Sequence, residues 1–310
     1  MPSNFSDSLP EGWLAFELGV LRRLQFRSVI DPFAGEAATL AYVKRWGARV
    51  AANDTAQWAL ERARARVENN SEVLTESDVE VLLEDAYVPR HKLYNPALRR
   101  WFGETDAWWF DNVRSNIEKL ESQYKRALAL ALGMAVGDYV FSFNLETRDL
   151  RQPLSLTNVF RRLWRSLPPP VNNRQRNSST NQSARTFLGE TYDNDLLFLR
   201  LPHPPRATDS RNARVISWRE DWLRQSRAPQ AQTRLGAVGE TKEQYLKSLE
   251  DMLSIAAHIP VWAIAGISDG FVSSDELVET IGEARRIEAV YTKDFSELLG
   301  LKAVIVTATA

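Results

Sequence analysis

Short runs of apolar residues alternate along the chain with segments whose apolar residues recur every three or four positions. The first run, residues 27–31, leads directly into a Pro and a Gly, and residues 36–46 then change to helical spacing. A second apolar run at residues 48–52 is followed by helical spacing over residues 58–67. This succession of strand, tight turn and helix predicts an α/β domain.

A third strand is predicted at residues 79–83, and each of the three predicted strands is followed by or ends in an acidic residue. Strands that alternate with helices indicate a doubly wound, mostly parallel, Rossmann-like sheet. Ligands bind such sheets at the carboxyl ends of the strands. The three acidic residues in question are Asp31, Asp54 and Asp85.

The middle of the chain departs from this pattern. Apolar residues from Trp109 to Leu128 lie on one helical face, and residues 167–183 form a Pro-, Asn-, Ser- and Arg-rich segment that predicts a mobile basic loop. We therefore expect an α/β domain of residues 1–93 and 184–310, interrupted by a helical, Arg-rich insertion of residues 94–183. In the last part we predict strands at 196–201, 261–265 and 302–307, and helices at 241–259 and 273–281 that start with capping boxes.

Composition narrows the chemistry that the chain can perform. It has no cysteine, which excludes disulfides, thiolate metal sites and thiol nucleophiles, and its three histidines give no metal-ligand spacing, so no metal is expected. The N-terminal segment is polar, and no stretch of about 18 apolar residues occurs. We expect a cytoplasmic protein with no membrane segment.

The net charge of −1 conceals an uneven distribution of cations. Residues 151–230 contain 14 Arg, no Lys and 6 acidic residues, a surplus of eight positive charges. Arginine forms planar, bidentate contacts with phosphate, so this segment predicts contacts with a nucleic-acid backbone. An Arg-rich composition that merely solvates the surface is the alternative. The candidates for nucleic-acid contact are Arg151, Arg161, Arg162, Arg165, Arg174 and Arg176.

The loop after the first strand has the composition of a nucleotide-cofactor loop. Gly35 lets the backbone approach a ligand closely. Asp54, after the second strand, is placed to accept hydrogen bonds from the hydroxyls of an adenosine ribose, and Asp85 is placed to bond the adenine amino group. A dinucleotide dehydrogenase or a plain α/β turn would share these features.

The sequence around this loop resembles the Dam-like class of DNA adenine methyltransferases, within the S-adenosylmethionine-dependent methyltransferase superfamily. The resemblance is carried by residues 31–35, by residues 47–55 with their Asn-Asp pair, and by the run that ends at residues 67–70. It implies a methyltransferase sheet, S-adenosylmethionine as cofactor and double-stranded DNA as partner, with a target-recognition region in the insertion. The cofactor contacts that follow from the resemblance and the loop are Asp31, Pro32, Phe33, Gly35, Asn53, Asp54 and Asp85.

The second signature of that family is altered here. Its members carry Asp or Asn, two prolines and Tyr at the end of the fourth strand, where the acid or amide accepts from the target amino group and the Tyr stacks on the flipped base. The corresponding positions are His203, Pro204, Pro205 and Arg206. An alternative alignment puts Leu201 in the position of the acid. A neutral imidazole accepts one hydrogen bond but carries no negative charge, so the motif predicts a degraded catalytic site.

Three functions stay open at this point. The first is a catalytically degraded methyltransferase-like protein, a pseudoenzyme that binds DNA or a catalytic or restriction partner protein. The second is an active adenine-specific DNA methyltransferase of a restriction-modification system with a divergent catalytic loop. The third is an unrelated methyltransferase-fold or nucleotide-binding enzyme.

Overall fold

A computed structural model describes residues 12–143, 147, 154–202, 210–224, 235, 240–268, 271–295 and 302–310, with side chains from residue 216 onward in the helix that starts at 210. Its centre is one seven-stranded sheet with the order β3-β2-β1-β4-β5-β7-β6. The strands are β1 (Ser28–Asp31), β2 (Arg49–Asn53), β3 (Ser178–Thr180), β4 (Leu196–Arg200), β5 (Val261–Ser268), β6 (Arg286–Asp294) and β7 (Lys302–Thr309).

Five neighbouring strands run parallel, and only β7 is antiparallel to its neighbours β5 and β6. Val29 of β1 pairs with Val50 of β2 on one side and with Leu196 of β4 on the other, so the sheet extends from β1 in both directions. This is the doubly wound, mostly parallel, Rossmann-like sheet that the sequence predicts. The strand order reverses between β1 and β4, and their carboxyl ends border the crevice where such sheets bind ligands.

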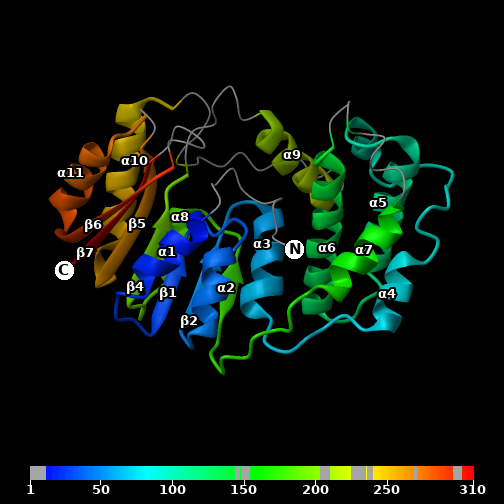
Figure 1. Cartoon of the computed structure of the whole chain (residues 1–310), viewed down its shortest axis with the longest axis horizontal. Helices are drawn as coiled ribbons and strands as arrows, with labels where there is room; N and C mark the ends of the chain where they lie inside the picture. Colours follow the sequence, from blue (N-terminus) through cyan, green and yellow to red (C-terminus); the bar gives the residue numbers. More distant parts are fainter. Residues whose placement is uncertain are drawn as a thin grey trace.

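Side chains of successive strand residues point alternately into two cores. In β4, Leu196 and Phe198 pack against α1 and α2, whereas Leu197 and Leu199 pack against α8, α10 and α11. Figure 1 shows these helices on the two sides of the sheet. The bounds are α1 (Trp13–Leu21), α2 (Ala38–Arg45), α8 (Ala184–Glu190), α10 (Lys242–Ile255), which continues in a short 3-10 turn (Ala256–His258), and α11 (Ser274–Ala284).

A second lobe, built of helices, lies beside the sheet (Figure 1). Its core is aromatic and contains Trp109, Phe110, Trp218 and Trp222, all fully buried. Helix α3 lies between the lobe and the sheet and contacts both. The bounds are α3 (Gln57–Ala63), a π-helical turn (Arg64–Glu68), α4 (Glu76–Leu83), a 3-10 turn (Pro96–Arg100), α5 (Glu104–Ile117), α6 (Gln123–Phe141), α7 (Leu156–Arg165) and α9 (Ser210–Arg224).

The strand predicted at residues 79–83 is wrong, because this segment is the second half of helix α4. The helix starts at a capping box in which Thr75 and Asp78 bond each other's backbone amides, a signal that outweighs the β-branched residues inside the helix. The third strand of the sheet is β3, a three-residue edge strand within the segment predicted as a mobile loop. Asn173 donates to the carbonyl of Ala48 at 2.7 Å, which ties that segment to the sheet.

Other predictions of local structure are confirmed. The predicted capping boxes at Thr241 and Ser273 both form, and the last three predicted strands are β4, β5 and β7. Helix α3 starts without a side-chain cap, and the carboxylate of the preceding Asp54 accepts the amides of Gly35 and Ala56. Strand β6 was missed. Among the described residues no helix combines the length and apolarity that crossing a membrane requires.

The helical lobe is assembled from two parts of the chain. Helices α4 to α7 lie between α3 and β3 in sequence, and α9, which follows β4, packs against α3, α5 and α6. The lobe therefore begins before residue 94 and receives one helix from beyond residue 183. The carboxyl side of β4 is thereby connected directly to the helical lobe.

Candidate functional site

The loop between β1 and α2 is held in a defined shape by its own backbone and by Asp31. The Oδ1 atom of this buried carboxyl group accepts the amide of Phe33 at 2.9 Å. Gly35 has a φ of +50° and Ala37 a φ of 54°. A Cβ atom at Gly35 would meet only the ring of Trp58 within 4 Å, at 4.0 Å. Among the described residues, only the ring of Trp58 thus lies at van der Waals distance in front of the half-buried glycine, where the missing Cβ allows close approach to the backbone.

Asp54 ties this loop to the end of β2. One carboxylate oxygen, Oδ2, accepts the amide of Gly35 at 3.0 Å, and Oδ1 accepts the amide of Ala56 at 2.8 Å. The amide of Ala34 donates to the carbonyl of Asn53 at 2.9 Å. The structure thus brings Asp54 and Gly35 into direct contact, as the sequence implies, but several loop amides already donate within the protein.

Asn53 links the carboxyl ends of three strands. Its Nδ2 donates to the carbonyl of Pro32 after β1 at 3.2 Å and to that of Gln182 after β3 at 3.1 Å. Its Oδ1 accepts from the hydroxyl of Thr180 at 2.8 Å and from the amide of Gln182 at 3.0 Å. Asn181 donates to the carbonyl of Asp54 at 2.7 Å. With the predicted Asn53, these residues fix the rim of the candidate site; Thr180, Asn181 and Gln182 were missed because a three-residue polar strand has no periodic signal.

Asp85 does not lie at the end of a sheet strand. It follows helix α4 in the helical lobe, is exposed, and has a φ of 50°. Its carbonyl accepts from Asn112 of α5 at 3.0 Å. The adenine contact expected of Asp85 depended on a strand at residues 79–83. Because this segment is helical, Asp85 is not at the carboxyl end of a strand and the basis of the prediction is lost. Asn181 and Gln182 occupy the carboxyl end of the third strand instead.

A buried ionic cluster lies next to Asp31 on the α1 and α2 side of the sheet. Arg200, the last residue of β4, donates to both carboxylate oxygens of Glu17, at 2.8 and 2.6 Å. Thr39 donates to Glu17 and accepts from Arg200, and the indole of Trp13 also donates to Glu17. The carboxylate of Glu17 is fully buried and receives four donors. The carboxyl end of β4 therefore carries a fixed ion pair.

The ionisation of Asp31 is displaced toward neutral pH. Burial raises the pKa of this carboxyl group to about 7, with a smaller contribution in the same direction from the negative charges of Glu17 and Asp54. The amide of Phe33 and the guanidinium of Arg200 oppose that rise. A carboxyl group with this pKa changes its charge in the physiological range, as groups at binding and catalytic sites often do.

The predicted catalytic residues His203, Pro204, Pro205 and Arg206 lie outside the described residues, as does Arg151. The residue before them, Pro202, accepts at its carbonyl a hydrogen bond of 3.0 Å from the hydroxyl of Tyr245 in α10. Strand β4 ends at Arg200, three positions before His203.

The described arginines proposed for nucleic-acid contact lie in two segments of the chain, helix α7 and the stretch before β3. Arg161 on α7 pairs with Glu76 of α4 at 2.9 Å, and Arg162 and Arg165 are exposed on the same helix. Arg174 and Arg176 are exposed in the segment that bonds Ala48 and Val50. These two residues therefore lie near the amino ends of the strands, opposite the cofactor loop.

A second cationic surface was not identified from the sequence. Residues 86–103 contain four Arg and Lys residues, one His and no acid. Lys92, Arg99 and Arg100 are exposed, and the guanidinium of Arg90 lies 4.8 Å from the ring of exposed Tyr94. Asn95 and Trp101 of the same segment donate to Asp221 of α9. The signal that could have revealed this surface is its lack of acidic residues.

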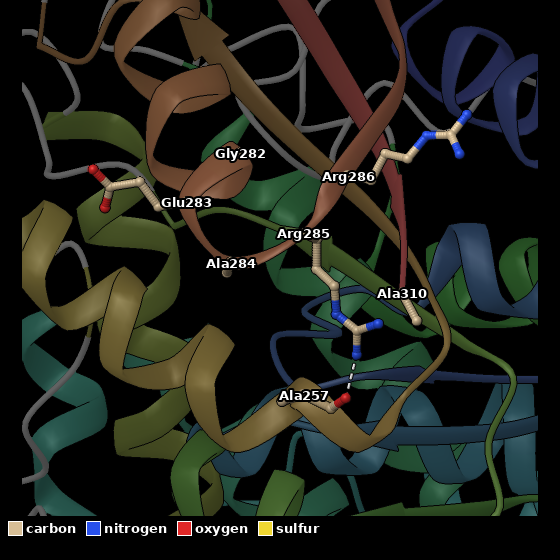
Figure 2. A pocket seen from close by; sticks show the side chains of 7 residues that line it. All are labelled: Ala257, Gly282, Glu283, Ala284, Arg285, Arg286 and Ala310. Atoms are coloured by element: carbon tan, nitrogen blue, oxygen red, sulfur yellow. Dashed lines mark hydrogen bonds between the residues drawn. The ribbon is translucent and has the colours of Figure 1, made fainter.

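Figure 2 shows a shallow hollow elsewhere on the molecule, lined by Ala257, Gly282, Glu283, Ala284, Arg285, Arg286 and Ala310. It lies at the amino ends of β5 and β6. Arg285 donates there to the carbonyl of Ala257 and stacks on Trp262 at 4.8 Å. None of the predicted site residues lines the hollow. In the described part of the chain, no group of three His, Asp or Glu residues is arranged to hold a metal ion.

Comparison with known proteins adds one relative. Over 120 residues the chain is 32% identical to a protein from Haemophilus parahaemolyticus described as Type II methyltransferase M2.HphI, a match that covers 39% of this chain and 34% of that protein. The aligned part thus spans about a third of the length of the relative. No protein-family model matches the chain. The similarity and the doubly wound sheet support a methyltransferase-like protein.

Proposed function

We propose that the chain is an S-adenosylmethionine-binding, methyltransferase-like protein whose catalytic motif is degraded, and that it acts by binding double-stranded DNA or a partner protein. The observation that carries the proposal is the contact between Asp54, after β2, and Gly35, in the loop after β1. This contact assembles a ribose-binding carboxylate and a glycine loop at the switch point of the sheet.

The residues present fit an adenosine cofactor. A Cβ atom at Gly35 would meet Trp58 only at van der Waals distance, and the carboxylate of Asp54, which accepts the amide of Gly35, is the candidate acceptor for the ribose hydroxyls. Asp31, buried at the carboxyl end of β1, offers a carboxyl group that changes its charge near neutral pH. When bound, S-adenosylmethionine would supply a methyl group on a sulfonium. A dinucleotide would use the same carboxylate, so the cofactor must be tested directly.

The residues at the end of β4 support the proposal that the catalytic motif is degraded. The family to which the resemblance points places an oxygen acceptor there, because methyl transfer builds positive charge on the accepting amine. In this chain the strand ends in Arg200, which is clamped by Glu17, and the altered motif follows at residues 203–206. Because Glu17 neutralises this guanidinium, the altered residues 203–206 alone support the proposal of a degraded motif.

For DNA binding we favour the surface formed by residues 90–100 over the one that carries Arg174 and Arg176. The first surface is bonded to α9 through Asp221, and α9 in turn contacts the cofactor loop. Arg174 and Arg176 lie near the amino ends of the strands, away from that loop. A restriction-system partner protein is the alternative that an absence of DNA binding would favour.

Titration calorimetry tests the cofactor site. S-adenosylmethionine and S-adenosylhomocysteine should bind saturably, and Asp54→Ala should weaken binding by about 1–3 kcal/mol, the range for losing a hydrogen-bonded charge. Lack of saturation at millimolar concentration, or preference for a nicotinamide dinucleotide, would contradict the proposal. A methylation assay with labelled cofactor and mixed-sequence DNA should give turnover near background, and robust methylation would instead establish an active enzyme with a divergent catalytic loop.

A further inference from the structure

Four charged side chains meet between the cofactor loop and the helical lobe, and each residue is at most 5% exposed. Arg219 of α9 contacts Glu36 of the cofactor loop, Nη1 to Oε1, at 2.7 Å. The same guanidinium bonds both carboxylate oxygens of Asp138 in α6, at 3.1 and 2.6 Å. Arg62 of α3 lies 3.4 Å from both carboxylates. The cluster joins the loop to three helices and its four charges balance, while the partly exposed guanidinium of Arg66 lies 3.5 Å from Glu36.

The position of Arg219 suits its chemistry. Burial of a charge is costly unless a partner with good geometry compensates, and the planar fork of Arg219 offers two nitrogens to Asp138 and a third to Glu36, whereas a lysine would offer a single nitrogen. Burial alone would raise the pKa of Glu36, but Arg62, Arg219 and Arg66 outweigh it and lower that pKa to about 2. Glu36 is therefore charged, and its position depends on the guanidinium groups around it.

Arg219 also reaches the loop by a second route. Its guanidinium lies over the ring of Trp58, 4.9 Å from the centroid. Trp58 is the side chain against which Gly35 is placed, since its ring is the nearest atom group to a Cβ at that glycine. One side chain of α9 thus contacts residue 36 directly and backs the wall behind residue 35.

Helix α9 is itself fixed on the helical lobe. Trp218 and Trp222 are fully buried against Gly137 and Gly133 of α6, where a methyl group would overlap either indole ring. Trp222 donates to the carbonyl of Phe110 in α5 at 3.0 Å. The position of α9 on the lobe therefore determines where Arg219 stands.

We propose that Arg219 is a positioning residue for the cofactor loop, and that its contact with Glu36 sets the affinity of this loop for an adenosine ligand. The inference rests on the proposed function for the identity of the ligand. Through Arg219, the helical lobe, which carries the cationic surface, makes a direct ionic contact with the cofactor loop.

Two variants separate positioning from stability. Arg219→Lys keeps the charge but replaces the three donor nitrogens of the guanidinium by one, and it should weaken binding of S-adenosylhomocysteine about tenfold. Trp222→Phe loosens α9 on α5 and α6 without touching Glu36. It should lower the melting temperature at least as much as Arg219→Lys while affinity stays within about twofold, measured well below the transition of each variant.

Hydrogen exchange provides a readout without ligand. The amides of Gly35 and Glu36 should exchange about tenfold faster in Arg219→Lys than in the wild type, and at the wild-type rate in Trp222→Phe. Equal loop exchange in wild type and Arg219→Lys, unchanged affinity in that variant, or an equal loss of affinity in both variants would overturn the inference. If the wild type binds no adenosine ligand but the exchange difference appears, the proposed function fails and the positioning role stands.

Discussion

The raised pKa of Asp31 makes the stability of the protein depend on pH in an unusual direction. A carboxyl group whose folded pKa exceeds its unfolded pKa binds its proton more tightly in the folded state, so its ionisation destabilises the fold as pH rises between the two values. For Asp31 the window runs from 3.8 to about 7. At about 1.4 kcal/mol for each pH unit of this window, the full penalty is about 4 kcal/mol, of which about 2.5 kcal/mol develops between pH 5 and pH 8.

Asp31→Asn removes this titration and keeps an oxygen that can accept the amide of Phe33. The free energy of unfolding, measured by urea denaturation of both proteins at pH 5 and pH 8, should shift in favour of the variant by about 2.5 kcal/mol over that interval. Glu36→Gln is the matched control. The pKa of Glu36 is lowered to about 2, so its stabilisation is present above the unfolded value of 4.5 and is lost only as pH falls toward 2.

The control variant should therefore be destabilised by about 3–5 kcal/mol, the cost of breaking a buried ion pair, and by nearly the same amount at pH 5 and pH 8. If the difference between Asp31→Asn and wild type is the same at both pH values, Asp31 does not titrate in this window. The electrostatic account of the loop would then be wrong.

Three further predictions concern DNA binding, packing and catalysis. Replacing Arg99 and Arg100 by Gln should lower the slope of log affinity against log salt by about 2 for duplex DNA. The same change at Arg174 and Arg176 should leave the slope unchanged. The reverse result would place DNA near the amino ends of the strands. Gly137→Ala should destabilise the protein by about 1–3 kcal/mol in urea denaturation, because the methyl group would overlap Trp218. Gly19→Ala, at an exposed position of α1, should instead stabilise it by about 0.5–1 kcal/mol, and equal effects would contradict the packing of α9. Restoring the family motif with His203→Asp and Arg206→Tyr should raise methylation above the wild-type background, and a lowered activity would identify His203 as an adapted catalytic residue.

The sheet was predictable where local signals and burial agree. The apolar runs of β1, β2 and β4 are buried along their whole length, and the capping boxes at Thr241 and Ser273 mark helix starts chemically. The pairing of Gly35 with Asp54 was also accessible, because both follow strands whose carboxyl ends lie side by side in a parallel sheet.

The third strand could not be predicted in the same way. Residues 79–83 have strand-like composition, but Thr75 and Asp78 cap a helix there, and tertiary packing against α5 buries its apolar face. The true strand, β3, consists of Ser and Thr and is defined by its pairing with β2 alone. The contribution of Arg219 and Arg200 was equally hidden, since contacts over 183 sequence positions leave no local pattern.

The central claim is that an adenosine cofactor binds at the carboxyl ends of β1, β2 and β3. Hydrogen–deuterium exchange with and without S-adenosylhomocysteine tests it most directly. We predict protection confined to residues 32–37, 53–57 and 180–183, because ligand contacts there would reduce local opening of the backbone in these three segments. Protection centred on another surface, such as the hollow lined by Arg285 and Ala257, or no protection at saturating ligand, would contradict the account.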